Sequence, residues 1–157
     1  MKKLLAIVTI SFVLAFSVNA AESPITNEKA IEKLHEFFGL LDIQVYDKEN
    51  LSKIVTPDFR IFEVGNDFNL DSFASFIDGA SETLDETKWE LSNFVVSIDN
   101  KSAHISYFNK GSFKTKQNEL IRYDWMESVY MVLDGEELKL KFLQSDLVSE
   151  VTEQLGQ

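Results

Sequence analysis

The sequence predicts an α+β fold in which three N-terminal helices pack on one face of a curved antiparallel sheet. Apolar residues recur at three- and four-residue spacing in the first half of the chain, which is typical of amphipathic helices. From Lys88 onward the pattern changes to strand-like segments between short turn signals. Helices followed by an antiparallel meander cover one face of the sheet, and a bent sheet under such a cover forms a cone that tends to leave a cavity.

Residues 1–20 predict a secretory signal peptide that is cleaved after Ala20. Two lysines precede an apolar run of 13 residues, and Val18 and Ala20 supply the small side chains that a signal peptidase requires. The run is shorter than the roughly 20 apolar residues of a membrane span, and it holds no cysteine for a lipid anchor. We therefore expect export to the bacterial periplasm or medium, with residues 21–157 as a single mature domain.

The mature chain is strongly acidic. Residues 1–20 contain two lysines and no acidic residue, so the remaining 137 residues carry 13 basic and 26 acidic side chains, a formal charge of −13. Such a charge disfavours binding to nucleic acids and to anionic membrane surfaces. The absence of cysteine excludes a disulfide framework, a zinc–thiolate site and a cysteine nucleophile.

The first two helices are predicted before residue 57. One helix spans residues 25–41, with Thr26 as its N-cap. A second, short helix follows Asp47 and is stopped by Pro57. The apolar stripe of the first helix consists of Ala30, Ile31, Leu34, Phe37, Phe38 and Leu41.

A short strand over residues 58–64 and a third helix over residues 70–80, capped by Asn69, complete the first half. The pair Asp134-Gly135 predicts a tight hairpin with positive φ at both turn positions. Residues 150–157 predict a loose polar end. The meander is predicted as four strands over residues 89–98, 102–113, 119–133 and 136–145.

The order of these elements resembles the nuclear transport factor 2-like (NTF2-like) superfamily, in its SnoaL-like and DUF4440-like branch. The resemblance covers about residues 27–146 and is a pattern of order and hydrophobicity; this chain has Leu138 where members often carry tryptophan. It is carried by the amphipathic first helix, the third helix at 70–77, and the runs Ile54-Val55-Thr56-Pro57-Asp58-Phe59, Ile121-Arg122-Tyr123-Asp124-Trp125, Val132-Leu133-Asp134-Gly135 and Leu138-Lys139-Leu140.

The resemblance implies a cone with a pocket but does not fix an activity, because the superfamily includes isomerases, cyclases, dehydratases and many non-catalytic domains. We expect an exported domain that binds a small, largely apolar molecule or a partner protein. One alternative is an isomerase, cyclase or dehydratase that uses a pocket carboxylate as general base. Another is a structural or interaction domain that dimerises through its sheet, and a homodimer is expected because many such cones dimerise in this way.

Alternation along the strands groups the candidate site residues by face. Tyr107 and Asn109 share a face with Ile105 and are candidates to orient a ligand carbonyl, although a core tyrosine and a solvated asparagine would explain them more simply. On the third strand of the meander, Tyr123 and Trp125 share a face and are candidates to line the pocket.

Two carboxylates are candidate general bases. Glu127 shares the face of Tyr123 and Trp125, whereas Asp124 lies on the opposite face. A raised pKa would suit Glu127 to this role, with Tyr107 as hydrogen-bond donor. The simpler interpretation makes Glu127 a cross-strand partner of Lys110 or Lys141. No metal site is predicted, since neither of the two histidines belongs to a ligand spacing. No cofactor is predicted, since the sequence has no P-loop or dinucleotide fingerprint.

Overall fold

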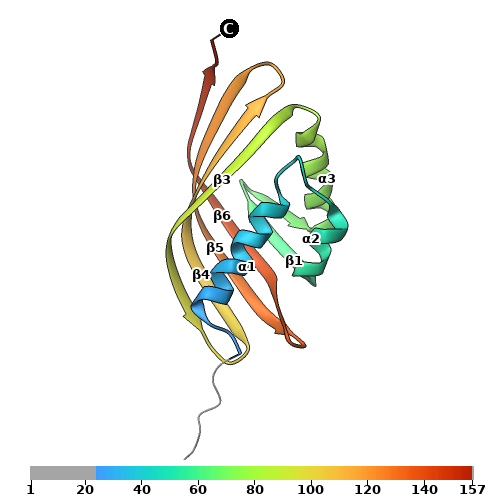
Figure 1. Ribbon diagram of the computed structural model, residues 1–157, viewed down its shortest axis with the longest axis vertical. Helices are drawn as coiled ribbons and strands as arrows, with labels where there is room; N and C mark the ends of the chain where they lie inside the picture. The colour runs from blue at the N-terminus through green and yellow to red at the C-terminus, as the bar shows by residue number, and fades with distance from the viewer. Residues whose placement is uncertain (1–23, 157) are drawn as a thin grey trace, which may run out of the picture.

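The computed structural model describes residues 24–156, so the predicted signal peptide lies outside the described residues. Three helices lie on one side of a long, curved sheet (Figure 1). In chain order the elements are α1 (Asn27–Leu40), α2 (Lys48–Ile54), β1 (Val55–Glu63), β2 (Asn66–Asn69), α3 (Leu70–Ser81), β3 (Leu84–Ile98), β4 (Ser102–Thr115), β5 (Glu119–Asp134) and β6 (Glu137–Gln154). The prediction of helices over a curved α+β sheet is confirmed.

The helices begin at the predicted capping residues. The Thr26 side chain accepts a hydrogen bond from the Lys29 backbone N–H at 3.3 Å, which satisfies one free donor at the start of α1. At the start of α3, Asn69 and Ser72 exchange side-chain and backbone hydrogen bonds in a capping box. The apolar stripe of α1 turns inward, and its fully buried members are Ala30, Leu34, Phe37 and Phe38.

The sheet is antiparallel as predicted except for one parallel pairing, which makes it mixed. Its six strands run in the order β2-β1-β6-β5-β4-β3, and β3 to β6 form the predicted antiparallel meander. β1 instead pairs with β6 in parallel, with Ile61 opposite Leu143. Alternation along a strand reports which side chains are buried but not which strand lies beside it, so the local pattern carried no sign of this long-range pairing.

The ends of the meander also differ from the prediction. β3 begins at Leu84, and β6 continues to Gln154, because β5 offers it a partner as far as Glu119. The expected loose end over residues 150–157 is therefore wrong as far as Gln154. In the β5–β6 hairpin the turn positions are Gly135 and Glu136, and only Gly135 has positive φ, as in a type II′ turn.

Irregularities in the strands bend the sheet toward the helices. The β3–β4 register shifts between Ser92 and Val95, where Asn93 adopts φ 56°. The β5–β6 register shifts twice, once beside Trp125 and once beside Met131. Such bulges increase local twist and curvature, so the sheet wraps around the helices as a cone.

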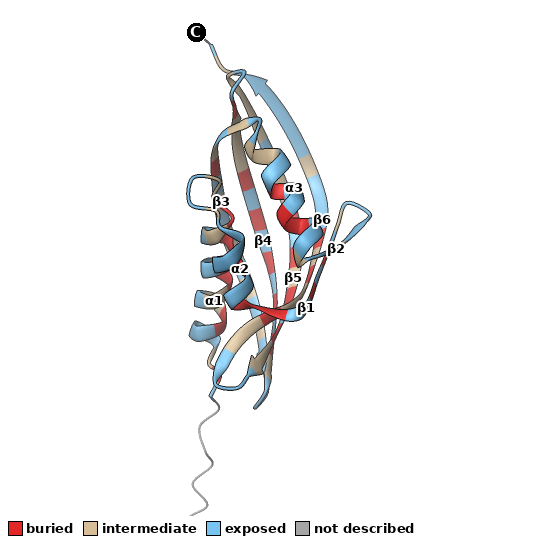
Figure 2. Cartoon of the chain, turned by 90° about the vertical axis from the view of Figure 1, so that its right-hand side faces the viewer, coloured by how far each residue is buried: buried red, intermediate tan, exposed pale blue. Residues whose placement is uncertain are grey.

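The core lies between the helices and the concave face of the sheet. Figure 2 shows buried residues along the inner strands and on the helix sides that face them. The convex face is different, because several large apolar side chains remain exposed on it. These are Phe62, Val95, Phe108, Met126 and Tyr130. Within residues 24–156 no helix is long and apolar enough to cross a membrane.

Candidate functional site

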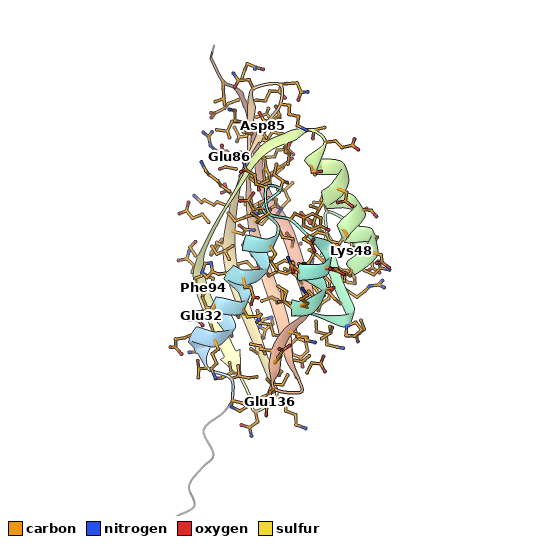
Figure 3. The ribbon with its side chains drawn as sticks, turned by 45° about the vertical axis from the view of Figure 1, so that its right-hand side comes forward. Glu32, Lys48, Asp85, Glu86, Phe94 and Glu136 are labelled. Atoms are coloured by element: carbon orange, nitrogen blue, oxygen red, sulfur yellow. The ribbon has the colours of Figure 1, made fainter. Side chains whose placement is uncertain are left out.

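A cavity of about 480 Å³ lies between the helices and the concave face of the sheet. Its walls come from α1, α3, the β1–β2 hairpin and the parts of β3 to β6 that face these elements. Asp85 and Glu86 on β3 mark the cavity end of the molecule in Figure 3, and Glu136 in the β5–β6 turn marks the opposite end. The cone is therefore hollow toward one end and packed toward the other.

One wall of the cavity is a cluster of four aromatic residues on three adjacent strands: Trp89, Phe113, Tyr123 and Trp125. The Trp89 and Phe113 rings pack edge to face, with their centroids 5.1 Å apart. The Tyr123 and Trp125 rings are tilted by 31°, with their centroids 5.0 Å apart. The two pairs are in contact through the rings of Phe113 and Trp125, whose centroids lie 6.3 Å apart. We call these four residues the aromatic wall.

The aromatic wall depends on Gly111 in β4. A Cβ atom at this position would lie 2.6 Å from Cε2 of Phe113 and 2.7 Å from Cζ3 of Trp125. Both distances are well below van der Waals contact, so the two rings lie directly over the glycine backbone. Gly111 therefore provides the space in which the aromatic wall packs.

Glu127 lies in the wall of this largely apolar cavity and is only 8% exposed. It stands in the middle of β5 between Tyr107 of β4 and Ser145 of β6. Its Oε1 accepts a hydrogen bond from Ser145 Oγ at 2.8 Å, and its Oε2 accepts one from Asn109 Nδ2 at 3.2 Å. Both donors are neutral, so no positive charge within residues 24–156 compensates the carboxylate.

This environment favours the protonated form of Glu127. Burial raises the pKa of its carboxyl from the ordinary 4.5 to about 7, and the hydrogen bond from Ser145 opposes the shift. Burial and the nearby Glu127 carboxylate also raise the pKa of Tyr107 well above its usual range. A carboxyl that titrates near neutral pH can take up or release a proton in the range where a general base operates.

Two further carboxylates, Glu63 from β1 and Glu150 from β6, line the same cavity. Burial raises the pKa of Glu63. Burial and, to a smaller extent, the negative charge of Glu150 raise the pKa of Tyr123. The residues that line the cavity include these three glutamates and no lysine, arginine or histidine among residues 24–156.

The structure brings together some of the predicted site residues and separates others. Tyr123, Trp125 and Glu127 line the cavity as a group. Tyr107 and Asn109 are almost fully buried behind Glu127, so Asn109 is not the solvated residue of the simpler interpretation. Asp124 lies on the opposite face of β5, where it accepts a hydrogen bond from Ser149 Oγ at 2.8 Å, and it does not line this cavity.

The interpretation of Glu127 as a partner of a surface lysine is wrong. Lys141 pairs with Asp58, and Lys110 comes to 4.0 Å from Asp124, so neither lysine reaches Glu127. Alternation along β4 turns Lys110 to the face opposite Asn109, and Lys141 is the extra residue at the β6 register shift between Leu140 and Phe142, where its side chain reaches Asp58.

Sequence reasoning missed several residues of the site: Glu63, Trp89, Phe113, Ser145 and Glu150. Glu63 could have been found from the sequence, because alternation along the strand that begins near residue 58 places it on the same face as Phe59 and Ile61. Within the described residues no three His, Cys, Asp or Glu side chains are grouped to hold a metal ion.

A wider depression of about 900 Å³ borders β3 and the ends of β4 to β6. It is more open to solvent, and charged side chains such as Lys110, Arg122 and Glu153 line it. The smaller cavity is the candidate site, because it combines apolar walls with a buried carboxylate.

Comparison with known proteins finds similarity in structure only. No protein-family model matches the chain, and no curated protein matches it. Among solved structures, a protein from Novosphingobium aromaticivorans provisionally named an aromatic ring hydroxylase superposes with a TM-score of 0.72 at 12% identity, over 84% of this chain and 94% of that one.

Two further structures extend the comparison. A type 2 hexachlorocyclohexane dehydrochlorinase (LinA) superposes with a TM-score of 0.69 at 9% identity, over 80% of this chain and 87% of that one. An NTF2-like protein of unknown function from Exiguobacterium sp. 255-15 gives a TM-score of 0.56 at 14% identity, over 74% of this chain and 98% of that one. Together with the three helices on a curved, open sheet, these matches show that the chain has the NTF2-like fold.

Proposed function

We propose that this protein binds a small, largely apolar molecule in the 480 Å³ cavity. The observation that carries the proposal is a preformed cavity with aromatic walls and a single deeply buried carboxylate, since ligand sites combine apolar surface with few polar groups. The indole N–H of Trp125 adds support, because it is buried in the cavity wall without a hydrogen-bond partner among residues 24–156. An unsatisfied buried donor of this kind is unusual in a folded protein and is typical of a functional site.

The comparisons and the N-terminus support two parts of this proposal. One structural neighbour is named for an enzyme that acts on hexachlorocyclohexane, which is a small apolar molecule. The signal-peptide pattern of residues 1–20 supports export, so we propose that binding takes place in the periplasm or outside the cell.

Blocking the cavity should abolish binding. Ala80, on the last turn of α3, lines the cavity, whereas Ser75 on the same helix is exposed and does not. We expect wild type and Ser75→Trp to bind the uncharged dye N-phenyl-1-naphthylamine, measured by fluorescence titration, and Ala80→Trp to lose most of this binding. Equal dye binding by the two tryptophan variants would contradict the proposal.

Catalysis by Glu127 is the second candidate function. The observation that favours it is a carboxyl inside the cavity whose pKa is raised to about 7 by burial. In an isomerase, cyclase or dehydratase reaction Glu127 would take a proton from the bound molecule as general base. Tyr107 and Asn109 would then position Glu127 rather than contact the bound molecule, since neither residue lines the cavity.

We also propose that two copies associate through the convex face of the sheet. Exposed Phe108 and Met126 stand opposite each other on β4 and β5, and Tyr130 lies farther along β5 on the same face. Contiguous exposed apolar residues of this kind favour an interface between copies. Met126→Lys should sediment as a smaller species than wild type, whereas Val45→Lys, an exposed residue between α1 and α2, should not. Unchanged sedimentation of Met126→Lys would contradict this dimer.

A further inference from the structure

The charges around the cavity are all of one sign. Glu63, Glu127 and Glu150 approach it from three different strands, and no basic side chain among residues 24–156 lines it. None of the three forms a salt bridge in the described part of the chain, although surface acids such as Asp58 and Asp67 do. The negative charge of the cavity therefore has no partner within the described protein.

The polar groups next to Glu127 do not supply that partner. Asn109 and Ser145 donate neutral hydrogen bonds to the carboxylate. Asn109 Oδ1 is also buried, without a hydrogen-bond partner among residues 24–156, and the Tyr107 hydroxyl beside the carboxylate is likewise a neutral group. An ionised carboxylate in such surroundings is costly unless a positive charge approaches it.

The aromatic wall adds a second attraction for a positive charge. The faces of Trp, Tyr and Phe rings carry negative potential and attract ammonium groups, with Trp the strongest. Trp89, Phe113, Tyr123 and Trp125 all line the cavity with Glu127. Aromatic rings beside an unpaired carboxylate are the chemistry by which proteins recognise organic ammonium ions.

We propose that the cavity binds an organic ammonium ion, a protonated amine or a quaternary ammonium, whose apolar body lies against the aromatic wall. This inference rests on the proposed function and specifies the ligand class for the same cavity. The cationic head lies toward Glu127, and Glu63 and Glu150 contribute a negative field from their own strands.

The test compares two molecules of nearly the same shape that differ in charge. Benzyltrimethylammonium and its uncharged isostere neopentylbenzene compete at pH 8 for bound N-phenyl-1-naphthylamine in the full protein. We expect the cation to displace the dye at a concentration at least about tenfold lower than the neutral isostere. Glu127→Gln should reduce this preference by about fivefold or more, because it removes the negative charge and keeps the shape of the side chain. Glu137→Gln, which removes one exposed charge near the β5–β6 turn, should leave the preference unchanged.

The outcomes separate the two proposals. If the isostere binds as well as the cation, or if Glu127→Gln keeps the full preference, the ammonium inference is overturned while binding of apolar molecules stands. If neither the dye nor either probe binds wild type, the proposed function fails and the inference fails with it. A thermal melt of each variant, checked before titration, shows that a loss of binding is not a loss of folding.

Discussion

The Glu127→Gln variant should be more stable than the wild-type protein at pH 8. Burial raises the pKa of Glu127 to about 7 in the folded state, from an ordinary value of 4.5 that the unfolded chain regains. At pH 8 the wild-type protein must hold an ionised, 8% exposed carboxylate, whereas glutamine has the same shape and no charge. The shift corresponds to about 3 kcal/mol, so we expect the free energy of unfolding to rise by about that amount.

The sign of the pH dependence follows from the same shift. Between pH 4.5 and about 7 the folded protein binds more protons at Glu127 than the unfolded chain does. The contribution of this residue to stability is therefore fully present below pH 4.5 and is lost as the pH rises through about 7. The two proteins should be nearly equal in stability at pH 4.5 and differ most at pH 8.

Urea denaturation of both proteins from pH 4.5 to 8.5 measures this difference. Glu63, whose pKa is also raised by burial, is present in both proteins, so its effect cancels in the comparison. Glu137→Gln serves as a control and should follow the wild-type curve, because Glu137 is exposed. Parallel curves for wild type and Glu127→Gln would mean that Glu127 is not held in a desolvated state. A buried group that lowers stability in this way is typical of a functional site.

The Gly111→Ala variant should be destabilised, although alanine is normally the better residue in a folded chain. Its Cβ would come within 2.6 Å of the Phe113 ring and 2.7 Å of the Trp125 ring. Ring atoms held in a packed cluster cannot both move away, so the aromatic wall must shift. We expect a loss of about 1–3 kcal/mol in the free energy of unfolding, the usual cost of overpacking. The tryptophan fluorescence of the folded protein should change as well, because Trp125 must move.

Gly39→Ala provides a matched control with the opposite expected sign. Gly39 lies in α1, and a Cβ added there would meet no heavy atom of the described residues within 4 Å beyond its own helix backbone and chain neighbours. Alanine should therefore stabilise the helix by about 0.5–1 kcal/mol. If Gly111→Ala and Gly39→Ala change stability alike, the contact between Gly111 and the aromatic wall does not constrain the fold.

Local patterns account for the parts of the fold that were predicted correctly. The apolar stripe of α1 and the capping residues Thr26 and Asn69 act within a few residues of chain, so their signals are readable from the sequence. Alternation along β5 likewise placed Tyr123, Trp125 and Glu127 on one face. These features needed no knowledge of the neighbouring strands.

The rest of the site depends on register between strands. Ser145 meets Glu127 because β6 pairs with β5 through two register shifts, and nothing in the local sequence of either strand specifies their positions. Glu63 reaches the cavity because β1 joins the sheet beside β6, a contact between distant parts of the chain. The environment that raises the pKa of Glu127 is made of such contacts, so it could not be predicted from the strand pattern alone.

The parallel pairing of β1 with β6 also sets the order in which the chain can assemble. Ile61 lies opposite Leu143, 82 positions later, whereas the hairpins from β3 to β6 join strands that are adjacent in sequence. Closing a long loop costs more entropy than closing a hairpin, and non-local contacts form late. The four-stranded meander can therefore form first as a curved platform, and the segment from α1 to α3 docks on it afterwards. The cavity is then completed only at the last stage of folding, when the segment from α1 to α3 closes over the platform.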